Sequence, residues 1–140
     1  VTVTNCFNVD YDNYRIVVSG IDFAIGGFLY YIQLGGKTAN YYGSCYVDTY
    51  TGAATTTFRS NNSNQLSIGV QDVDNSAFSI DILRPYVSTP TTLHGNHYGG
   101  GYSGWLGGIQ AENASLTSFT INSGNGTFTG GTIRVYGYRN

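Results

Sequence analysis

The segment FLYYIQL, from Phe28 to Leu34, alternates two kinds of position. Its even-numbered residues are large and apolar, whereas the odd-numbered residues include the polar Gln33. A period of two is typical of a β-strand that buries one face, because successive side chains point to opposite sides of a sheet. The same alternation recurs at Tyr14–Val18, Leu66–Val70 and Phe78–Ile82. These segments predict antiparallel strands with one buried and one solvated face.

The composition supports an all-β fold. The 140 residues include 20 Gly and 13 Tyr but no Met, and only 10% are charged. Good helix formers are scarce, whereas Thr, Tyr, Val and Ile are plentiful. We find no amphipathic helix and count about eight short strands separated by Gly, Asn and Ser turns. The sequence therefore predicts one domain, residues 1–140, folded as an antiparallel sandwich or barrel.

Two segments interrupt this series of short alternating strands. Residues 49–65 are polar and rich in turn formers, which predicts a long loop or the tip of a hairpin. Residues 94–110, HGNHYGGGYSGWLGGIQ, hold seven glycines together with two His, two Tyr and the only Trp of the chain. We interpret this second segment as a glycine-rich loop.

The charge balance excludes two classes of partner. The formal net charge is −2 at pH 7, and the six Lys and Arg residues are scattered along the chain. Binding to nucleic-acid phosphates or to anionic lipids needs clustered basic side chains. No apolar segment approaches the ~18 residues that a membrane-spanning helix needs. We therefore expect no nucleic-acid partner and no membrane insertion.

Cys6 and Cys45 are the only cysteines, and both lie in strand-like segments. Two cysteines do not make a disulfide framework. They are expected to be either buried free thiols or one disulfide. We expect no metal on this pair and no cofactor.

Three segments resemble the terminal domains of tail fibres and related virion proteins of tailed phages, in particular cyanophages and other marine phages. They are Asn5–Gly20 (NCFNVDYDNYRIVVSG), Leu83–Gly99 (LRPYVSTPTTLHGNHYG) and Gly130–Asn140 (GGTIRVYGYRN). The resemblance implies an antiparallel β-sandwich, jelly-roll-like, that forms the C-terminal part of a longer virion protein. Such domains are commonly trimeric and contact the host at fibre tips, while others decorate capsids or tails.

The glycine-rich segment departs from that family pattern, and a specific binding function is expected there. Trp105, Tyr98 and Tyr102 offer rings on which the apolar face of a sugar could stack, with His97 beside them. Loops carry a large share of binding residues. The predicted ligand is a glycan of the host cell surface. The alternative is that Trp105 packs beneath the loop as its anchor.

The sequence holds a few candidate metal ligands, but their spacing favours roles other than metal binding. His94 and His97 could share a metal ion on a loop, but exposed or hydrogen-bonded histidines are the alternative that we favour. Segments 10–13 and 72–75 both read Asp-x-Asp-Asn. They lack the Gly and the distal Glu of a calcium loop, so turns are expected. We predict no metal site.

A complete catalytic set is not recognisable. A glycosidase needs two carboxylates in one cleft, whereas the Asp residues fall in predicted turns or on solvated faces, and the single Glu, Glu112, falls in a predicted polar turn. No Gly-x-Ser-x-Gly motif accompanies the Ser, His and Asp residues. We therefore predict that the protein is not an enzyme.

The last predicted strand places Arg134 and Tyr136 on one face, opposite Ile133 and Val135. An unprotected edge strand invites association, and Tyr and Arg are enriched at interfaces. We expect Arg134 and Tyr136, joined by Tyr31, to form the interface of a homotrimer. The alternative is that the tyrosines of this strand pack on neighbouring strands.

The function predicted at this stage is a non-enzymatic, trimeric tail-fibre tip that attaches the virion to its host by binding a surface glycan. One alternative is a capsid or tail decoration module that binds other virion proteins. Another is a free-standing, monomeric lectin-like module. Cell attachment would separate the first two, and the oligomeric state would separate both from the third.

Overall fold

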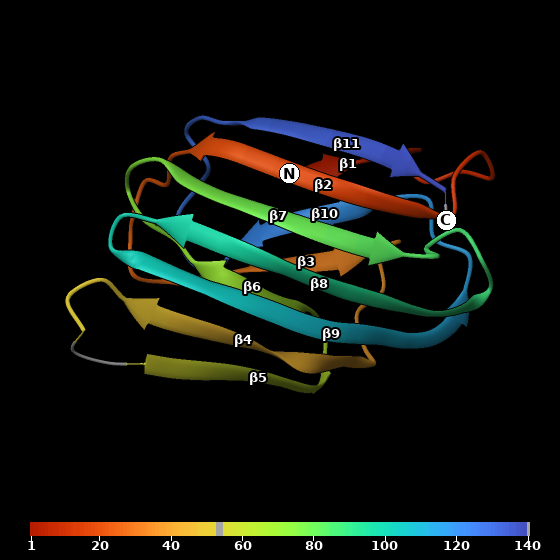
Figure 1. Ribbon diagram of the computed structural model, residues 1–140, viewed down its shortest axis with the longest axis horizontal. Helices are drawn as coiled ribbons and strands as arrows, with labels where there is room; N and C mark the ends of the chain where they lie inside the picture. The colour runs from red at the N-terminus through yellow and green to blue at the C-terminus, as the bar shows by residue number, and fades with distance from the viewer. Residues whose placement is uncertain (53–54, 140) are drawn as a thin grey trace.

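The computed structural model describes residues 1–52 and 55–139, which form eleven β-strands and no helix, hence none that could span a membrane. The strands lie in two antiparallel sheets that face each other, so the predicted β-sandwich is confirmed (Figure 1). The smaller sheet has the order β1-β10-β3-β6, and the larger sheet β11-β2-β7-β8-β9-β4-β5. The strands are β1 (Thr2–Val3), β2 (Asn13–Ile21), β3 (Leu29–Leu34), β4 (Tyr41–Thr49), β5 (Thr55–Ser63), β6 (Leu66–Val70), β7 (Ser76–Leu83), β8 (Thr89–Gly99), β9 (Tyr102–Ala114), β10 (Phe119–Ser123) and β11 (Thr132–Tyr138).

The strand order is that of a jelly roll with three additions. Eight strands are distributed as β1-β10-β3-β6 in one sheet and β2-β9-β4-β5 in the other, which is the arrangement of an eight-stranded jelly roll. The hairpin β7–β8 is inserted between β2 and β9, and β11 is added beyond β2. The jelly-roll-like topology is therefore present, in a larger sheet that is wider than expected.

Alternating apolar side chains from the two sheets fill the space between them. Tyr30, Ile32 and Leu34 of β3 are fully buried, as the period of two predicts, and the equivalent residues of β2 and β7 are buried too. Phe28 is an exception, because it precedes β3 and is exposed. All five residues of β6 are buried. The pattern with one solvated face therefore holds for β2 and β3 but not for β6.

The glycine-rich segment is a β-hairpin, so the predicted loop is wrong. Residues 94–110 belong to β8 and β9, which are joined at Gly100 and Gly101. Both turn residues have positive φ, as a two-residue hairpin connection requires. Residues 55–63 likewise form β5, the edge strand that pairs with β4. The polar segment 49–65 is therefore largely part of a hairpin.

Glycines on the inner face let the two sheets approach each other. Gly43 of β4 lies opposite Gly108 of β9, and Leu66 of the smaller sheet packs over both. A Cβ would lie 2.9 Å from Leu66 Cδ1 if added to Gly43, and 2.8 Å if added to Gly108. Protein interiors are packed too densely to absorb such overlaps freely. Residues that look like loop formers in the sequence are therefore part of the core.

Both cysteines are free thiols, so the disulfide alternative is wrong. Cys45 is buried in β4, and Cys6 lies in the connection between β1 and β2. Burial raises the pKa of Cys6 to about 11 and that of Cys45 to about 12, because a thiolate is poorly solvated in apolar surroundings. Both thiols are therefore protonated and unreactive near neutral pH.

Two neighbouring glycines of β9 test this packing. Gly108 faces Leu66, whereas a Cβ added to Gly107 would meet no atom within 4 Å. We expect Gly108→Ala to lower the free energy of unfolding by about 1–3 kcal/mol through overpacking. Gly107→Ala should leave it unchanged or raise it by up to ~1 kcal/mol, because glycine is unfavourable within a strand. Urea unfolding measures both changes, and equal effects would contradict this account.

Candidate functional site

The outer face of the larger sheet carries a row of mostly polar side chains from five neighbouring strands. The registers of β11, β2, β7, β8 and β9 place its members side by side: Tyr136, Arg15, Asp81, His94 and Gly107. Alternate residues of a strand point the same way, so the next row on this face brings Asn96 opposite Trp105, and Trp105 opposite Tyr46. Residues from distant parts of the sequence therefore meet on one surface.

Trp105 stands out on this surface. The residue is 54% exposed, and its ring stacks on that of Tyr46, with centroids 5.7 Å apart and an interplanar angle of 14°. Tyr98 is a diagonal neighbour on the same face and is 53% exposed. Trp105 is therefore a supported platform on the sheet, and the alternative that it anchors a loop from beneath is wrong.

An open depression of about 450 Å³ lies beside Trp105. Its lining comes from β2, β7, β8 and β9 and includes Arg15, Asp81, His94, Asn96 and Trp105. The depression thus combines one aromatic wall with a guanidinium, a carboxylate, an imidazole and an amide. It offers both donors and acceptors of hydrogen bonds.

The polar centre of the depression is the ion pair of Arg15 and Asp81. Nε and Nη2 of Arg15 donate to Oδ1 and Oδ2 of Asp81 over 2.9 and 2.7 Å, and the Tyr138 hydroxyl donates to Oδ1 over 3.0 Å. The bonds from Arg15, helped by Tyr138, hold the pKa of Asp81 below its ordinary value although burial acts in the opposite direction. Asp81 is therefore a fixed, ionised acceptor near neutral pH.

Two of the four residues expected to bind a glycan lie on the inner side of the sheet. His97 is fully buried and Tyr102 packs against the core, because both have the opposite parity to Tyr98 and Trp105 along their strands. His97 Nε2 donates to the carbonyl of Tyr46 over 3.1 Å, and Nδ1 has no hydrogen-bond partner among the described residues. His97 therefore supports the sheet beneath the platform, and a surface ligand can reach only Trp105 and Tyr98 of the four.

His94 and His97 cannot share a metal ion within one chain. They are three positions apart on a strand and point to opposite faces, so His94 is exposed while His97 is buried. The part of the chain that the structure describes holds no group of three His, Cys, Asp or Glu side chains that could bind a metal. That part includes both Asp-x-Asp-Asn segments.

The residues expected at a subunit interface do not form one patch. Arg134 and Tyr136 are exposed on the edge strand β11, while Ile133 and Val135 pack against the core. The predicted outward orientation of Arg134 and Tyr136 is thus confirmed. Tyr31 lies on β3 in the smaller sheet, so it belongs to the other layer of the sandwich.

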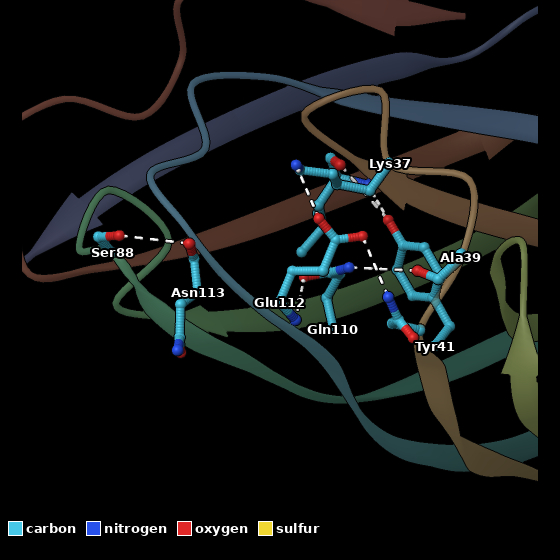
Figure 2. A network of polar contacts seen from close by, with 9 residues as sticks. Lys37, Ala39, Tyr41, Ser88, Gln110, Glu112 and Asn113 are labelled. Carbon is cyan, nitrogen blue, oxygen red and sulfur yellow. Dashed lines mark hydrogen bonds and ion pairs between the residues drawn. The ribbon is translucent and has the colours of Figure 1, made fainter.

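A second polar cluster holds the connection between β3 and β4 against β9 (Figure 2). Lys37 Nζ pairs with Glu112 Oε2 over 2.8 Å, and Asn40 Nδ2 donates to Glu112 Oε1 over 3.3 Å. Gln110 is fully buried, and its Nε2 donates to the Ala39 carbonyl over 3.2 Å. Glu112 therefore lies in a strand, not in the predicted turn, and its partners give it a structural role.

Sequence reasoning missed Arg15, Asp81 and Asn96 as members of the site. A charged residue between Ile80 and Ile82 is typical of any half-solvated strand. The sequence around Asp81 therefore does not identify it as a member of the site. Its partner Arg15 lies 66 positions away in the sequence. Only the register of the strands brings the two together, and alternation alone does not determine that register.

Comparison of the chain with protein-family models, curated proteins and solved structures finds no match.

The stability of the fold should depend on pH through His97. Burial lowers the pKa of this buried imidazole, and the hydrogen bond to Tyr46 offsets only part of the effect. In the unfolded chain the pKa is about 6.5, so below that pH the unfolded state takes up a proton that the folded state does not. We expect the free energy of unfolding to fall as the pH drops below ~6.5 toward the lowered pKa, and His97 to contribute no pH dependence above that range.

The matched variant is His97→Gln, which keeps an N–H group near the Tyr46 carbonyl and removes the titrating ring. Thermal unfolding between about pH 7.5 and pH 5.5 measures the effect. The loss of stability on acidification should be smaller in this variant than in the wild type. An equal loss in both proteins would rule out a buried neutral imidazole as its source.

Proposed function

We propose that this protein is a non-enzymatic carbohydrate-binding domain whose ligand lies against Trp105 on the outer face of the larger sheet. The observation that carries the proposal is the exposed Trp105 ring, supported by Tyr46 and placed at the rim of a polar depression. Exposed aromatic groups beside a depression with a few convergent polar groups are typical of binding sites.

The chemistry of the depression suits a sugar ring. A pyranose has an apolar face, which stacks on an aromatic ring, and an edge of hydroxyl groups, which needs donors and acceptors. Trp105 supplies the ring, and Asn96 and Asp81 supply an amide and an acceptor. Arg15 uses two of its five N–H groups on Asp81, so three do not bond that carboxylate.

The same groups favour binding over catalysis. Asp81 is the only carboxylate that lines the depression in the described structure, whereas glycoside hydrolysis uses two. Arg15 and Tyr138 keep its pKa low, so it is a poor general acid at neutral pH. A sugar bound here would be held unchanged.

We place this binding on the virion of a tailed phage, where it attaches the particle to a glycan of the host surface. The support is the resemblance of Asn5–Gly20, Leu83–Gly99 and Gly130–Asn140 to virion domains. Each of these segments contributes a strand to the outer face described above: β2, β8 and β11. Within this proposal the protein is a homotrimer at a tail-fibre tip.

A decoration module that binds other virion proteins is the second candidate, and the edge of β11 favours it. This strand pairs with β2 along one side, and no other strand of the described residues pairs with its other side. A free edge presents backbone groups with which another chain can pair.

Removing the Trp105 ring should weaken glycan binding strongly and leave the fold intact. Wild type and Trp105→Ala are compared on a glycan array and then by calorimetry with the best ligand. We expect Trp105→Ala to weaken binding about 30-fold, as the loss of a central aromatic contact of ~2 kcal/mol implies. Tyr86→Ala removes another exposed tyrosine, in the connection between β7 and β8, and should bind like the wild type.

Gly107→Leu obstructs the site without deleting any contact. Its Cβ would meet no atom within 4 Å, and the side chain would emerge between His94 and Ser44 on the outer face. We expect lost binding with retained stability. Unchanged binding by both Trp105→Ala and Gly107→Leu would contradict the proposed site.

Light scattering on a size-exclusion column tests the assembly. The chain mass is 15.1 kDa, and we expect a species of three times that mass. A monomer that still binds glycans would remove the trimer and favour a free-standing lectin-like module. A trimer that binds no glycan would favour the decoration module.

A further inference from the structure

We infer that the ligand is an internal segment of a linear polysaccharide, bound across the strands from Trp105 on β9 to Tyr136 on β11. This inference rests on the proposed carbohydrate-binding function and specifies the class of ligand. A single terminal sugar, by contrast, would occupy only the depression beside Trp105.

Two open depressions meet at Arg15. The first is the depression beside Trp105, and the second lies between Arg15, Tyr136 and Tyr138. Because Arg15 lines both, the two depressions are neighbours along the row of side chains across the sheet, and we call the pair the groove. At its far end β11 is the last strand of the sheet in the described structure, so the groove runs out to the sheet edge.

The groove is long enough for several sugars. The strands β9, β8, β7, β2 and β11 are consecutive neighbours, so four spacings of about 4.8 Å place the first and the last ~19 Å apart. One sugar unit of an extended chain is about as long as one strand spacing, so about four units fit between Trp105 and Tyr136.

The groove has an aromatic ring near each end and a charged pair between them. Tyr136 is 52% exposed, close to the value for Trp105. The side chain of Arg15 is 54% exposed and that of Asp81 is 10% exposed. Arg15 therefore reaches the surface with N–H groups that do not bond Asp81, and these can bind the hydroxyls of a central sugar. Only a chain of sugars can contact Trp105, Arg15 and Tyr136 together.

This use of Tyr136 is compatible with a trimer. Assembly through the edge of β11 would use the backbone groups of that strand. The side chain of Tyr136 lies on the sheet face, perpendicular to that edge. The face would then stay open to a ligand while the edge is paired.

Calorimetry with malto-, cello- and chito-oligosaccharides of one to six units, together with the best ligand of the glycan array, tests the inference. We expect the affinity to rise with chain length up to about four units and then to level off. Tyr136→Ala should weaken binding of the four-unit chain about tenfold and leave the two-unit chain unaffected. Trp105→Ala should weaken both. Tyr42→Ala, an exposed tyrosine of β4 outside the groove, should change neither.

The outcomes separate this inference from the function on which it rests. A monosaccharide that binds as tightly as the four-unit chain, while Trp105→Ala still binds poorly, would overturn the inference and keep the function. A fall of Tyr136→Ala to the mass of one chain would overturn it too, because Tyr136 would then belong to a subunit interface. Absence of binding to every glycan tested would overturn the function and the inference together.

Discussion

The packing of Leu66 over Gly43 and Gly108 is the contact on which the rest of the sandwich depends. It joins the two sheets where the larger one has no side chains of its own to fill the gap. A strand that commits one set of residues to the core commits the alternate set to the outside, because its side-chain period is two. Tyr46 and Trp105 are therefore displayed on the surface as a direct consequence of how β4 and β9 pack beneath it.

Core and candidate site are two faces of the same strands. On the inner face His97 bonds the Tyr46 carbonyl, and a Cβ added to the adjacent Gly104 would lie 2.6 Å from His97 Nε2. On the outer face the Tyr46 ring supports Trp105. Hydrogen-bonded strands hold these rings in place before any ligand arrives, so less conformational entropy is lost on binding than a mobile loop would lose.

The alternation of apolar residues was sufficient to predict the sandwich and the inward faces of β2, β3 and β11, since one side of each strand packs on the core. It failed for the glycine-rich segment 94–110, because such a stretch ordinarily indicates a loop. Here several of the glycines leave room for close packing and do not form a turn. Residue type alone indicated Trp105 and Tyr98 but equally Tyr102 and His97, which lie on the inner side of the sheet. The pair of Arg15 and Asp81 could not be predicted, because it depends on strand register and on β7, a strand added to the jelly-roll frame.

The pairing of β11 with β2 has a consequence for how the molecule is made. Its register joins Asn13 to Tyr138 and Ser19 to Thr132, so residues from near the two ends of the domain must find each other. Contacts this distant in sequence slow the folding of β proteins, because closing a long loop costs entropy. During synthesis one side of β2 is unpaired, and Asp81 lacks its Tyr138 bond, until β11 has emerged from the ribosome. A chain truncated before β11 would expose the unpaired edge of β2, and such an edge tends to pair with other chains.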